Sequence, residues 1–226
     1  LILSLRDVTA KQRAKEILKR RNLELALLNQ AGRAFSATLD LDKVLATVLE
    51  EVRRLMGVVA CSIWLVDKKT DDLICRQATG PKKELVQGWR LSKGKGLVGL
   101  VATTGKSLNI ANVLEDEQHF AGIDEETGLA LRSILSVPLK VKKQVIGVIQ
   151  ALDTQVNRFT DSDKVLLEAL GTSAATAIDN ARLVETLRRR TADLKASNQE
   201  LEAFAHTVAH DLKEPLTHVI GYTEVL

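Results

Sequence analysis

The chain has 226 residues, a length that suits one or two domains. Apolar residues make up 45% of it, but aromatic residues make up only 3%, so platforms for stacking nucleic-acid bases are scarce. The net charge is +3 and residues 31–180 are neutral overall, which argues against a nucleic-acid-binding face. No apolar run approaches the ~20 residues of a membrane span, and no signal peptide opens the chain. The chain starts at Leu1 rather than at Met, which indicates a piece of a longer protein.

The first segments predict a strand and then a helix. Residues 1–8, LILSLRDV, alternate in polarity as a strand does. After Thr9 the apolar residues recur at helical spacing as far as Phe35. Asp40 is a suitable N-cap for a second helix, LDKVLATVLEEVRRLM, which is expected to end before Gly57.

The middle of the chain is rich in predicted strands. VVACSIWLVD is apolar on both alternating faces, which indicates a strand that is covered on both sides, and DLICRQAT follows as its hairpin partner. LVQGWRL predicts another strand, followed by a glycine-rich turn, a short helix, a glycine stop and a short strand. Residues 113–130 predict a loop with a short helix. SILSVPLKV and QVIGVIQALD predict a hairpin that turns at Lys142 and Lys143.

From Thr160 onward the pattern is helical. Thr160 and Asp163 resemble a capping box, and between Thr160 and Pro215 the only helix breaker is Gly171. A continuous helix over this stretch would be ~80 Å long at ~1.5 Å per residue. Its later part carries an apolar stripe at seven-residue spacing, which predicts a parallel two-helix coiled coil and a homodimer. The stripe consists of Leu187, Leu194, Leu201 and Val208, with Leu183 and Phe204 at the intervening position.

The central part resembles a GAF domain. The resemblance rests on SIWLVD, GLVGLVATTGKSLNIANV, LRSILSVPLKVKKQVIGVIQALD and NRFTDSD, within residues 23–180. It implies an α+β fold: a central antiparallel sheet of about six strands, flanked by helices, with a small-molecule pocket on the face away from the terminal helices. Long N- and C-terminal coiled-coil helices would extend from this domain. Lys143 departs from the Gly or Asn that is common at this hairpin turn.

The two ends resemble parts of sensor histidine kinases. LSLRDVTAKQRAKE is similar to the last strand and exit of a PAS domain. FAHTVAHDLKEPLTHVIGYTEVL resembles the phosphoacceptor helix of the HisKA type. These resemblances imply five segments: a PAS strand over 1–9, a linker helix over 10–36, a GAF domain over 37–180, a signalling helix over 181–202 and the phosphoacceptor segment over 203–226.

The phosphoacceptor motif consists of His210, Asp211, Lys213 and Pro215, followed by Leu. A phosphoacceptor imidazole needs one nitrogen as the nucleophile, and a neighbouring carboxylate such as Asp211 can accept a hydrogen bond from the other nitrogen. Pro215 has no N–H and crowds the carbonyl of Asp211, which predicts a bend near His210. Lys213 is expected to help hold the phosphate charge. Glu214 stands where relatives carry Asn or Thr, so the resemblance does not imply the phosphatase activity of those relatives.

Four other patterns predict less. His206 and His210 are half a metal site without a third ligand, so no metal is expected. The glycines of GKGLVG match a dinucleotide-binding pattern, but no parallel strand precedes them, and a tight turn into a short helix explains them. Cys61 and Cys75 suit small core residues, with a redox role as the alternative.

The fourth pattern, NRFTDSD, partly matches cyclic-nucleotide-binding GAF domains through Phe159 and Asp163. Lys164 replaces the acid that those domains carry. A helix start alone accounts for much of this match. Cyclic-nucleotide binding therefore stays an alternative.

The sequence thus predicts a cytoplasmic sensory and relay segment of a two-component histidine kinase, with the GAF domain controlling ATP-dependent autophosphorylation of His210 and phosphotransfer to a response regulator. ATP and Mg would belong to a kinase domain that lies outside these residues, so the segment is expected to be inactive by itself. The GAF ligand is not predicted. One alternative is a ligand-free GAF module for dimerisation and relay, and another is a GAF regulator that binds cyclic nucleotides.

Overall fold

The computed structural model describes residue 26, residues 28–115 and residues 130–223, with side chains through residue 208. The predicted strand over 1–9, most of the linker helix and most of the predicted loop over 113–130 lie outside the described residues. Residues 28–35 are helical. The further elements in chain order are α2 (Leu41–Met56), β1 (Ala60–Val66), β2 (Leu73–Thr79), α3 (Lys83–Val86), β3 (Arg90–Leu91), α4 (Gly96–Thr104), β4 (Leu108–Ile110), η1 (Val113–Glu115), β5 (Ser133–Val141), β6 (Gln144–Asp153) and α6 (Asp161–Thr223).

Helix α2 begins and ends where its capping residues predict. The Asp40 carboxylate accepts hydrogen bonds from the backbone N–H groups of Asp42 and Lys43, so two donors of the first turn are satisfied. Gly57 has a left-handed backbone (φ 62°), and its N–H donates to the carbonyl of Arg53. The buried face of the helix points its apolar residues into the core. Both predicted ends of this helix are confirmed.

The six described strands form one antiparallel sheet in the order β3-β2-β1-β6-β5-β4. β1 and β2 form the first predicted hairpin, and β5 and β6 form the second. The second hairpin turns at Lys142, whose φ of 55° places a non-glycine residue in the left-handed region. β1 and β6 lie at the centre of the sheet and are buried on both faces, as the apolar run of β1 predicts. The α+β fold expected from the sequence is confirmed.

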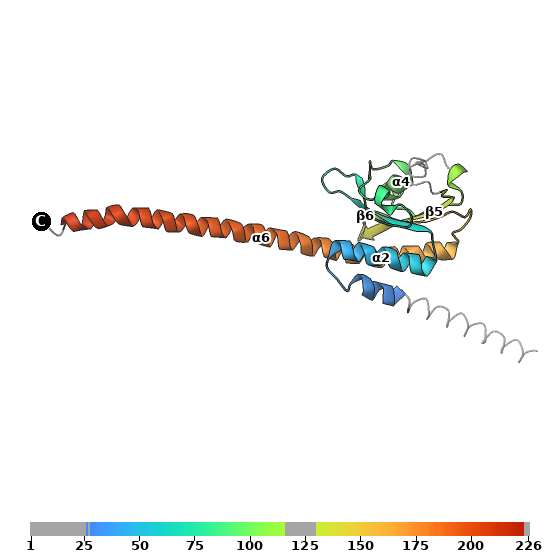
Figure 1. Cartoon of the computed structure of the whole chain (residues 1–226), viewed down its shortest axis with the longest axis horizontal. Coiled ribbons are helices and arrows are strands. Elements are labelled where there is room, and N and C mark those ends of the chain that lie inside the picture. The colour runs from blue at the N-terminus through green and yellow to red at the C-terminus, as the bar shows by residue number, and fades with distance from the viewer. Residues whose placement is uncertain (1–25, 27, 116–129, 224–226) are drawn as a thin grey trace, which may run out of the picture. The chain divides into compact units, whose positions relative to one another are not determined.

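The largest core lies between one face of the sheet and the helices α2 and α6 (Figure 1). Cys61, Ile63 and Leu65 of β1 contribute to it, as do Leu167 and Leu170 of α6. Helix α6 comes close to the sheet at Gly171. A Cβ atom at this residue would be 3.4 Å from the Val137 side chain. The first part of α6, as far as Ala181, therefore belongs to the core of the domain.

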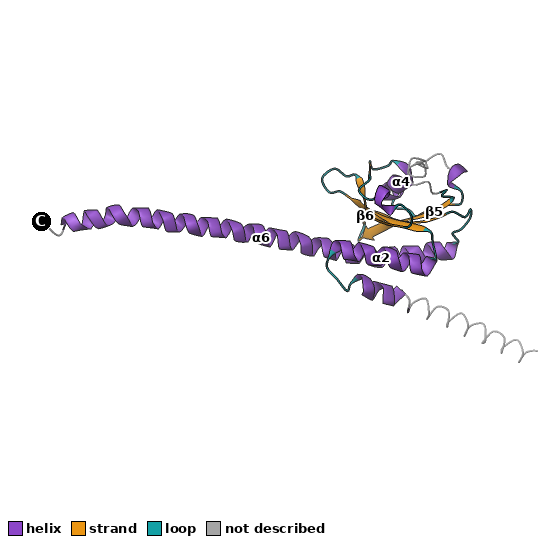
Figure 2. Ribbon diagram, viewed as in Figure 1, coloured by secondary structure: helices purple, strands orange, loops and turns teal. Residues whose placement is uncertain are grey.

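The opposite face of the sheet is covered by α4 (Figure 2). Trp64 of β1 and Val148 of β6 pack against Val98 and Val101 of α4. Gly105 ends this helix with a left-handed backbone (φ 64°), as the sequence predicts. The two faces therefore have separate cores, one beneath the long helices and one beneath α4, and a smaller cluster includes Leu97 of α4 and Leu152 of β6.

The predicted strand LVQGWRL is shorter than expected. Lys83–Val86 is one turn of helix, and only Arg90–Leu91 is extended and paired in the sheet. Gly88 lies between them with φ 87°, a conformation outside the strand region. The N–H of Gly88 still donates to the carbonyl of Cys75, so the turn is fixed to β2. A glycine in an apolar run here marks a turn and not a strand interior.

Helix α6 is continuous over 63 residues and contains Pro215 within its length. The predicted long C-terminal helix is thus confirmed. The chain divides into two compact units with the boundary between Arg182 and Leu183, so α6 begins in the GAF-like unit and continues as the second unit. Among the described residues, no helix combines the length and apolar character that crossing a membrane requires.

Candidate functional site

A chain of polar side chains lies on the α4 side of the sheet. The Trp64 indole donates to Ser62 Oγ at 3.0 Å, and the Ser62 hydroxyl lies 3.4 Å from Gln150 Oε1. Gln150 Nε2 donates to Ser136 Oγ at 2.7 Å. The backbone brings these residues together because Ser62 on β1 and Ser136 on β5 both pair with Gln150 on β6. Four residues from three adjacent strands therefore share one buried hydrogen-bonded chain.

A cavity of about 40 Å³ lies beside these hydrogen-bonded side chains. Ser62, Gln150 and Trp64 line it together with apolar residues of the neighbouring strands. Lys83, in the turn of helix after β2, also lines it, and its side chain is exposed. Because one water molecule needs roughly 10–15 Å³ on this measure, the cavity has room for a few waters or a small ligand. This face, away from α2 and α6, is the one on which the resemblance to GAF domains implies a small-molecule pocket.

The two cysteines lie on different faces of the sheet. Cys61 packs in the core beneath the long helices, and Cys75 packs beneath α4. Burial raises the pKa of the Cys61 thiol to about 12, although a hydrogen bond with Thr79 acts in the opposite direction. Burial likewise raises the pKa of Cys75 to about 12. Both thiols therefore stay protonated near neutral pH, which disfavours thiolate chemistry and agrees with a packing role.

The glycine pattern of residues 94–99 forms a tight turn. Gly94 and Gly96 have left-handed backbones, with φ of 84° and 63°. A Cβ atom at Gly99 would lie 2.8 Å from the backbone of Gly94, so only glycine fits this close approach. The turn leads into α4 on an antiparallel sheet, whereas dinucleotide binding uses a parallel βαβ unit. The interpretation as a tight turn is confirmed.

The NRFTDSD segment holds the start of α6. Asp163 Oδ2 accepts from the backbone N–H and the hydroxyl of Thr160, at 2.8 and 2.7 Å, and the N–H of Asp163 donates to Thr160 Oγ1 at 3.2 Å. Arg158 donates to the carbonyl of Met56 at 2.6 Å and lies 3.8 Å from the carboxylate of Asp153. Phe159 is buried in the core beneath the long helices. These contacts give the segment a structural role and place its side chains away from the cavity.

The predicted phosphoacceptor residues His210, Asp211, Lys213 and Pro215 all lie within α6. Their side chains are outside the described ones, so their mutual contacts and the predicted bend are not part of the described structure. His206, one turn earlier, is exposed. Within the part of the chain with described side chains, no three His, Cys, Asp or Glu residues gather into a metal-binding group.

Sequence reasoning left the lining of the pocket unassigned. Its polar lining includes Ser62, Gln150 and Lys83, and Ser136 is joined to Gln150 by a hydrogen bond. Ser62 and Gln150 interrupt the apolar runs ACSIWLV and QVIGVIQALD. The signal that could have found them is an uncharged polar residue inside a strand that is buried on both faces. Lys83 carries no comparable signal, because it lies in a polar turn.

The sequence model of the GAF domain matches residues 38–179. The chain is also 30% identical over 184 residues to a protein of Caenorhabditis elegans named probable 3',5'-cyclic phosphodiesterase pde-5. That match takes in 77% of this chain but only 25% of the nematode protein, so the chain spans about a quarter of the length of this relative.

Solved structures share the fold. The GAF domain of a phosphoenolpyruvate-protein phosphotransferase from Coxiella burnetii superposes with a TM-score of 0.65 at 21% identity, covering 72% of this chain and 96% of that one. The corresponding Acinetobacter domain gives 0.63 at 24% identity, covering 73% and 98%. The free methionine-R-sulfoxide reductase of Neisseria meningitidis gives 0.62 at 22% identity, covering 73% and 93%. At these identities the likeness concerns the fold and not the activity.

The sheet order, the separate covering of its two faces and the cavity above β1 and β6 agree with this match. More than half of the chain lies within the matched residues. The chain therefore belongs to the GAF-domain family.

Proposed function

We propose that the chain is a sensory and relay segment of a two-component sensor histidine kinase, in which the GAF domain controls ATP-dependent autophosphorylation of His210 and phosphotransfer to a response regulator. The observation that carries the proposal is the position of the His210 motif on α6, the helix that also forms part of the GAF core. In this proposal residues 1–9 end a PAS domain, and residues 203–226 begin the HisKA domain. The kinase domain that binds ATP and Mg lies outside these residues.

The continuity of α6 supports a relay. Leu167, Leu170 and Ile178 are buried against the sheet, so a change at the sheet acts directly on the first turns of the helix. No glycine or proline interrupts α6 between Gly171 and Pro215. A ligand that binds one arrangement of the domain more tightly than another would therefore shift the arrangement of the helix that carries His210.

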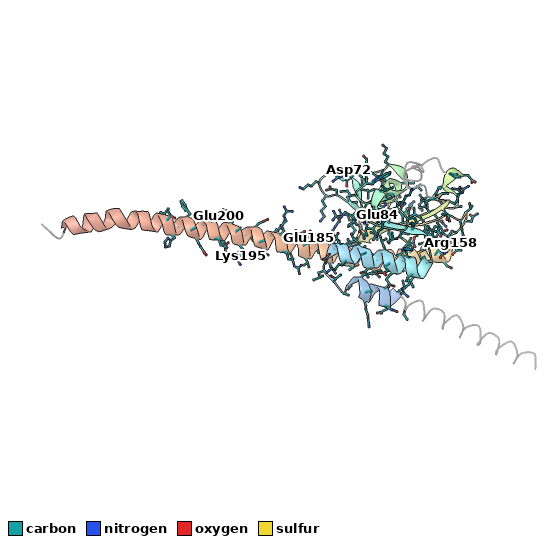
Figure 3. All side chains as sticks on the ribbon, in the orientation of Figure 1. Asp72, Glu84, Arg158, Glu185, Lys195 and Glu200 are labelled. Atoms are coloured by element: carbon teal, nitrogen blue, oxygen red, sulfur yellow. The ribbon has the colours of Figure 1, made fainter. Side chains whose placement is uncertain are left out.

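The apolar stripe on α6 supports a parallel homodimer. Leu187, Leu194 and Leu201 are 63%, 67% and 66% exposed in the single chain. Large apolar side chains at seven-residue spacing are removed from water when a second helix packs against them, and this burial stabilises a coiled coil. Figure 3 shows charged side chains, including Lys195 and Glu200, projecting from the same helix. The occupant that we propose for the stripe is the same helix of a second copy.

The kinase assignment is tested by phosphorylation. The chain is joined to the ATP-binding domain of a histidine kinase and incubated with radiolabelled ATP. We expect an acid-labile, base-stable label in the wild type and none in His210→Gln, because the label forms on an imidazole nitrogen. His206→Gln is the matched control, since His206 lies one turn away on the same helix, is exposed and should not affect labelling.

Equal labelling of wild type and His210→Gln would contradict the assignment, as would no labelling in a fusion that binds ATP. The ATP-binding competence of each fusion is measured separately with a fluorescent nucleotide. The chain would then be better described as a dimeric GAF relay. If His206→Gln alone lost the label, the phosphoacceptor would lie one turn before the proposed position.

A second candidate is a cyclic-nucleotide-regulated GAF module. The likeness to the nematode phosphodiesterase favours it, because the named substrates of that protein are cyclic nucleotides. Two observations argue against this candidate: the cavity is small, and the NRFTDSD segment holds the start of α6. Saturable binding of radiolabelled cyclic GMP by equilibrium dialysis, with competition by unlabelled nucleotide, would support this candidate.

A further inference from the structure

The indole of Trp64 fixes the direction of the buried polar chain. An indole N–H can only donate, so Ser62 Oγ accepts from Trp64 and its own hydrogen is free to point toward Gln150. The amide atom that faces Ser62 is then the acceptor Oε1, and the donor Nε2 faces Ser136. The three hydrogen bonds therefore all run in one direction from donor to acceptor, from β1 across β6 to β5.

Within the described part of the chain, this direction leaves two donor hydrogens without acceptors. Gln150 Nε2 carries two hydrogens, and Ser136 takes one of them. Among the described residues no acceptor is found for the second hydrogen, or for the hydroxyl hydrogen of Ser136. Gln150 is 4% exposed and Ser136 is fully buried, so bulk water does not satisfy these donors. The Gln150 donor belongs to the cavity lining and therefore favours an occupant that brings an acceptor.

The charges around the cavity favour an anion. Lys83 is the one charged side chain among the described residues that line it, and no Asp or Glu is among them. The remaining lining is mostly apolar and includes Ala78, Val86 and Leu152. An occupant that matches this lining has an apolar body, acceptor oxygens directed at Gln150 and a negative charge toward Lys83.

We propose that the cavity above β1 and β6 binds a small organic carboxylate, with its oxygens accepting from Gln150 and its charge balanced by Lys83. This inference rests on the proposed sensory role of the GAF domain and names the class of its ligand. The carboxylate offers the acceptors that the polar chain lacks, and the apolar lining covers the rest of the molecule. A cation is disfavoured because Lys83 already brings a positive charge and no Asp or Glu is among the described lining residues.

The proposal is tested with three probes that differ only in their polar group: pentanoate, pentanamide and pentylamine. Binding to the full chain is followed by the fluorescence of Trp64, in a Trp89→Phe background that leaves Trp64 as the only tryptophan. Trp64 lines the cavity and takes part in the polar chain, so an occupant changes its surroundings. We expect saturable binding of pentanoate, weaker binding of pentanamide and none of pentylamine.

Two substitutions assign the contacts. Gln150→Leu removes the buried donor and should weaken pentanoate binding about tenfold or more. Lys83→Gln should weaken pentanoate binding about two- to fivefold, because Lys83 is exposed, and should leave pentanamide binding unchanged. Lys82→Gln is the matched control: Lys82 is the adjacent residue, does not line the cavity and should have no effect.

Binding of all three probes with equal affinity would overturn the proposal, as would no binding of pentanoate. Equal binding of pentanoate and pentanamide, unaffected by Lys83→Gln, would mean a neutral carbonyl ligand. If Gln150→Leu unfolds the chain, the surface substitution Lys83→Gln still decides the matter. These measurements need no kinase domain, so their failure is distinct from a failure of His210 labelling.

Discussion

Burial determines the chemistry of the two cysteines. Both thiols have a pKa of about 12 in the folded chain, raised from 9.0 by removal from water. The folded state therefore holds protons that the unfolded state releases between about pH 9 and pH 12. By linkage, the stability that the two buried neutral thiols contribute is fully present below pH 9 and is lost as the pH rises from about 9 to about 12.

We expect neither cysteine to react with an aromatic disulfide reagent at pH 8 in the folded chain. Cys61 and Cys75 are both buried and protonated, and the thiolate is the reactive form. In denaturant both thiols should react, which the absorbance of the released thiolate measures. Rapid reaction of one thiol in the folded chain would contradict its packing role and would favour the redox alternative.

At the scale of elements, the start of α6 is fixed by contacts with three other segments. Asp163 closes the capping box with Thr160, and Arg158 connects this box to the end of β6 and the end of α2. Asn109 of β4 donates to the carbonyl of Phe159 at 3.0 Å. The first turn of the helix is thus fixed to β6, α2 and β4.

Loss of the capping box should destabilise the domain measurably. Asp163→Ala removes a side chain that accepts two hydrogen bonds at the helix start, and we expect a loss of about 1 kcal/mol in the free energy of unfolding. Urea unfolding followed by circular dichroism measures this change. Asp161→Ala is the control, because it removes an exposed carboxylate from the same turn and keeps the box. Equal losses in both variants would assign the effect to helix-end charge alone.

At the scale of the whole molecule, the exposed stripe of α6 predicts association. The stripe spans Leu183 to Val208 and has no partner among the described side chains. We expect the full chain to sediment as a dimer at micromolar concentration. Leu194→Glu together with Leu201→Glu should give a monomer, because both charges would face the seam of the coiled coil.

The control for the dimer is Lys195→Ala together with Glu200→Ala, which changes two exposed residues beside the stripe (Figure 3). This variant should remain dimeric in analytical ultracentrifugation. A wild-type monomer would contradict the coiled-coil prediction. A dimer that persists after both leucine changes would place the interface elsewhere on the chain.

Local patterns determined most of the elements. Asp40 and Gly57 mark both ends of α2, the apolar run of β1 predicts a strand covered on both sides, and the capping box marks the start of α6. These features are readable because they depend on neighbours within a few residues. The strand expected in LVQGWRL was wrong in extent, since the left-handed turn at Gly88 is fixed by β2.

By itself, the sequence determined the α+β class, the two central hairpins of the sheet and the long helix that contains His210. Only the tertiary structure decided which residues of β1 and β6 line the cavity, and that Ser62, Gln150 and Ser136 share one row of hydrogen bonds. Ser62 and Gln150 are 88 residues apart and meet only through the pairing of β1 with β6. Alternation along a strand assigns residues to two faces but does not say what covers each face, and that depends on how α2, α4 and α6 pack against the sheet.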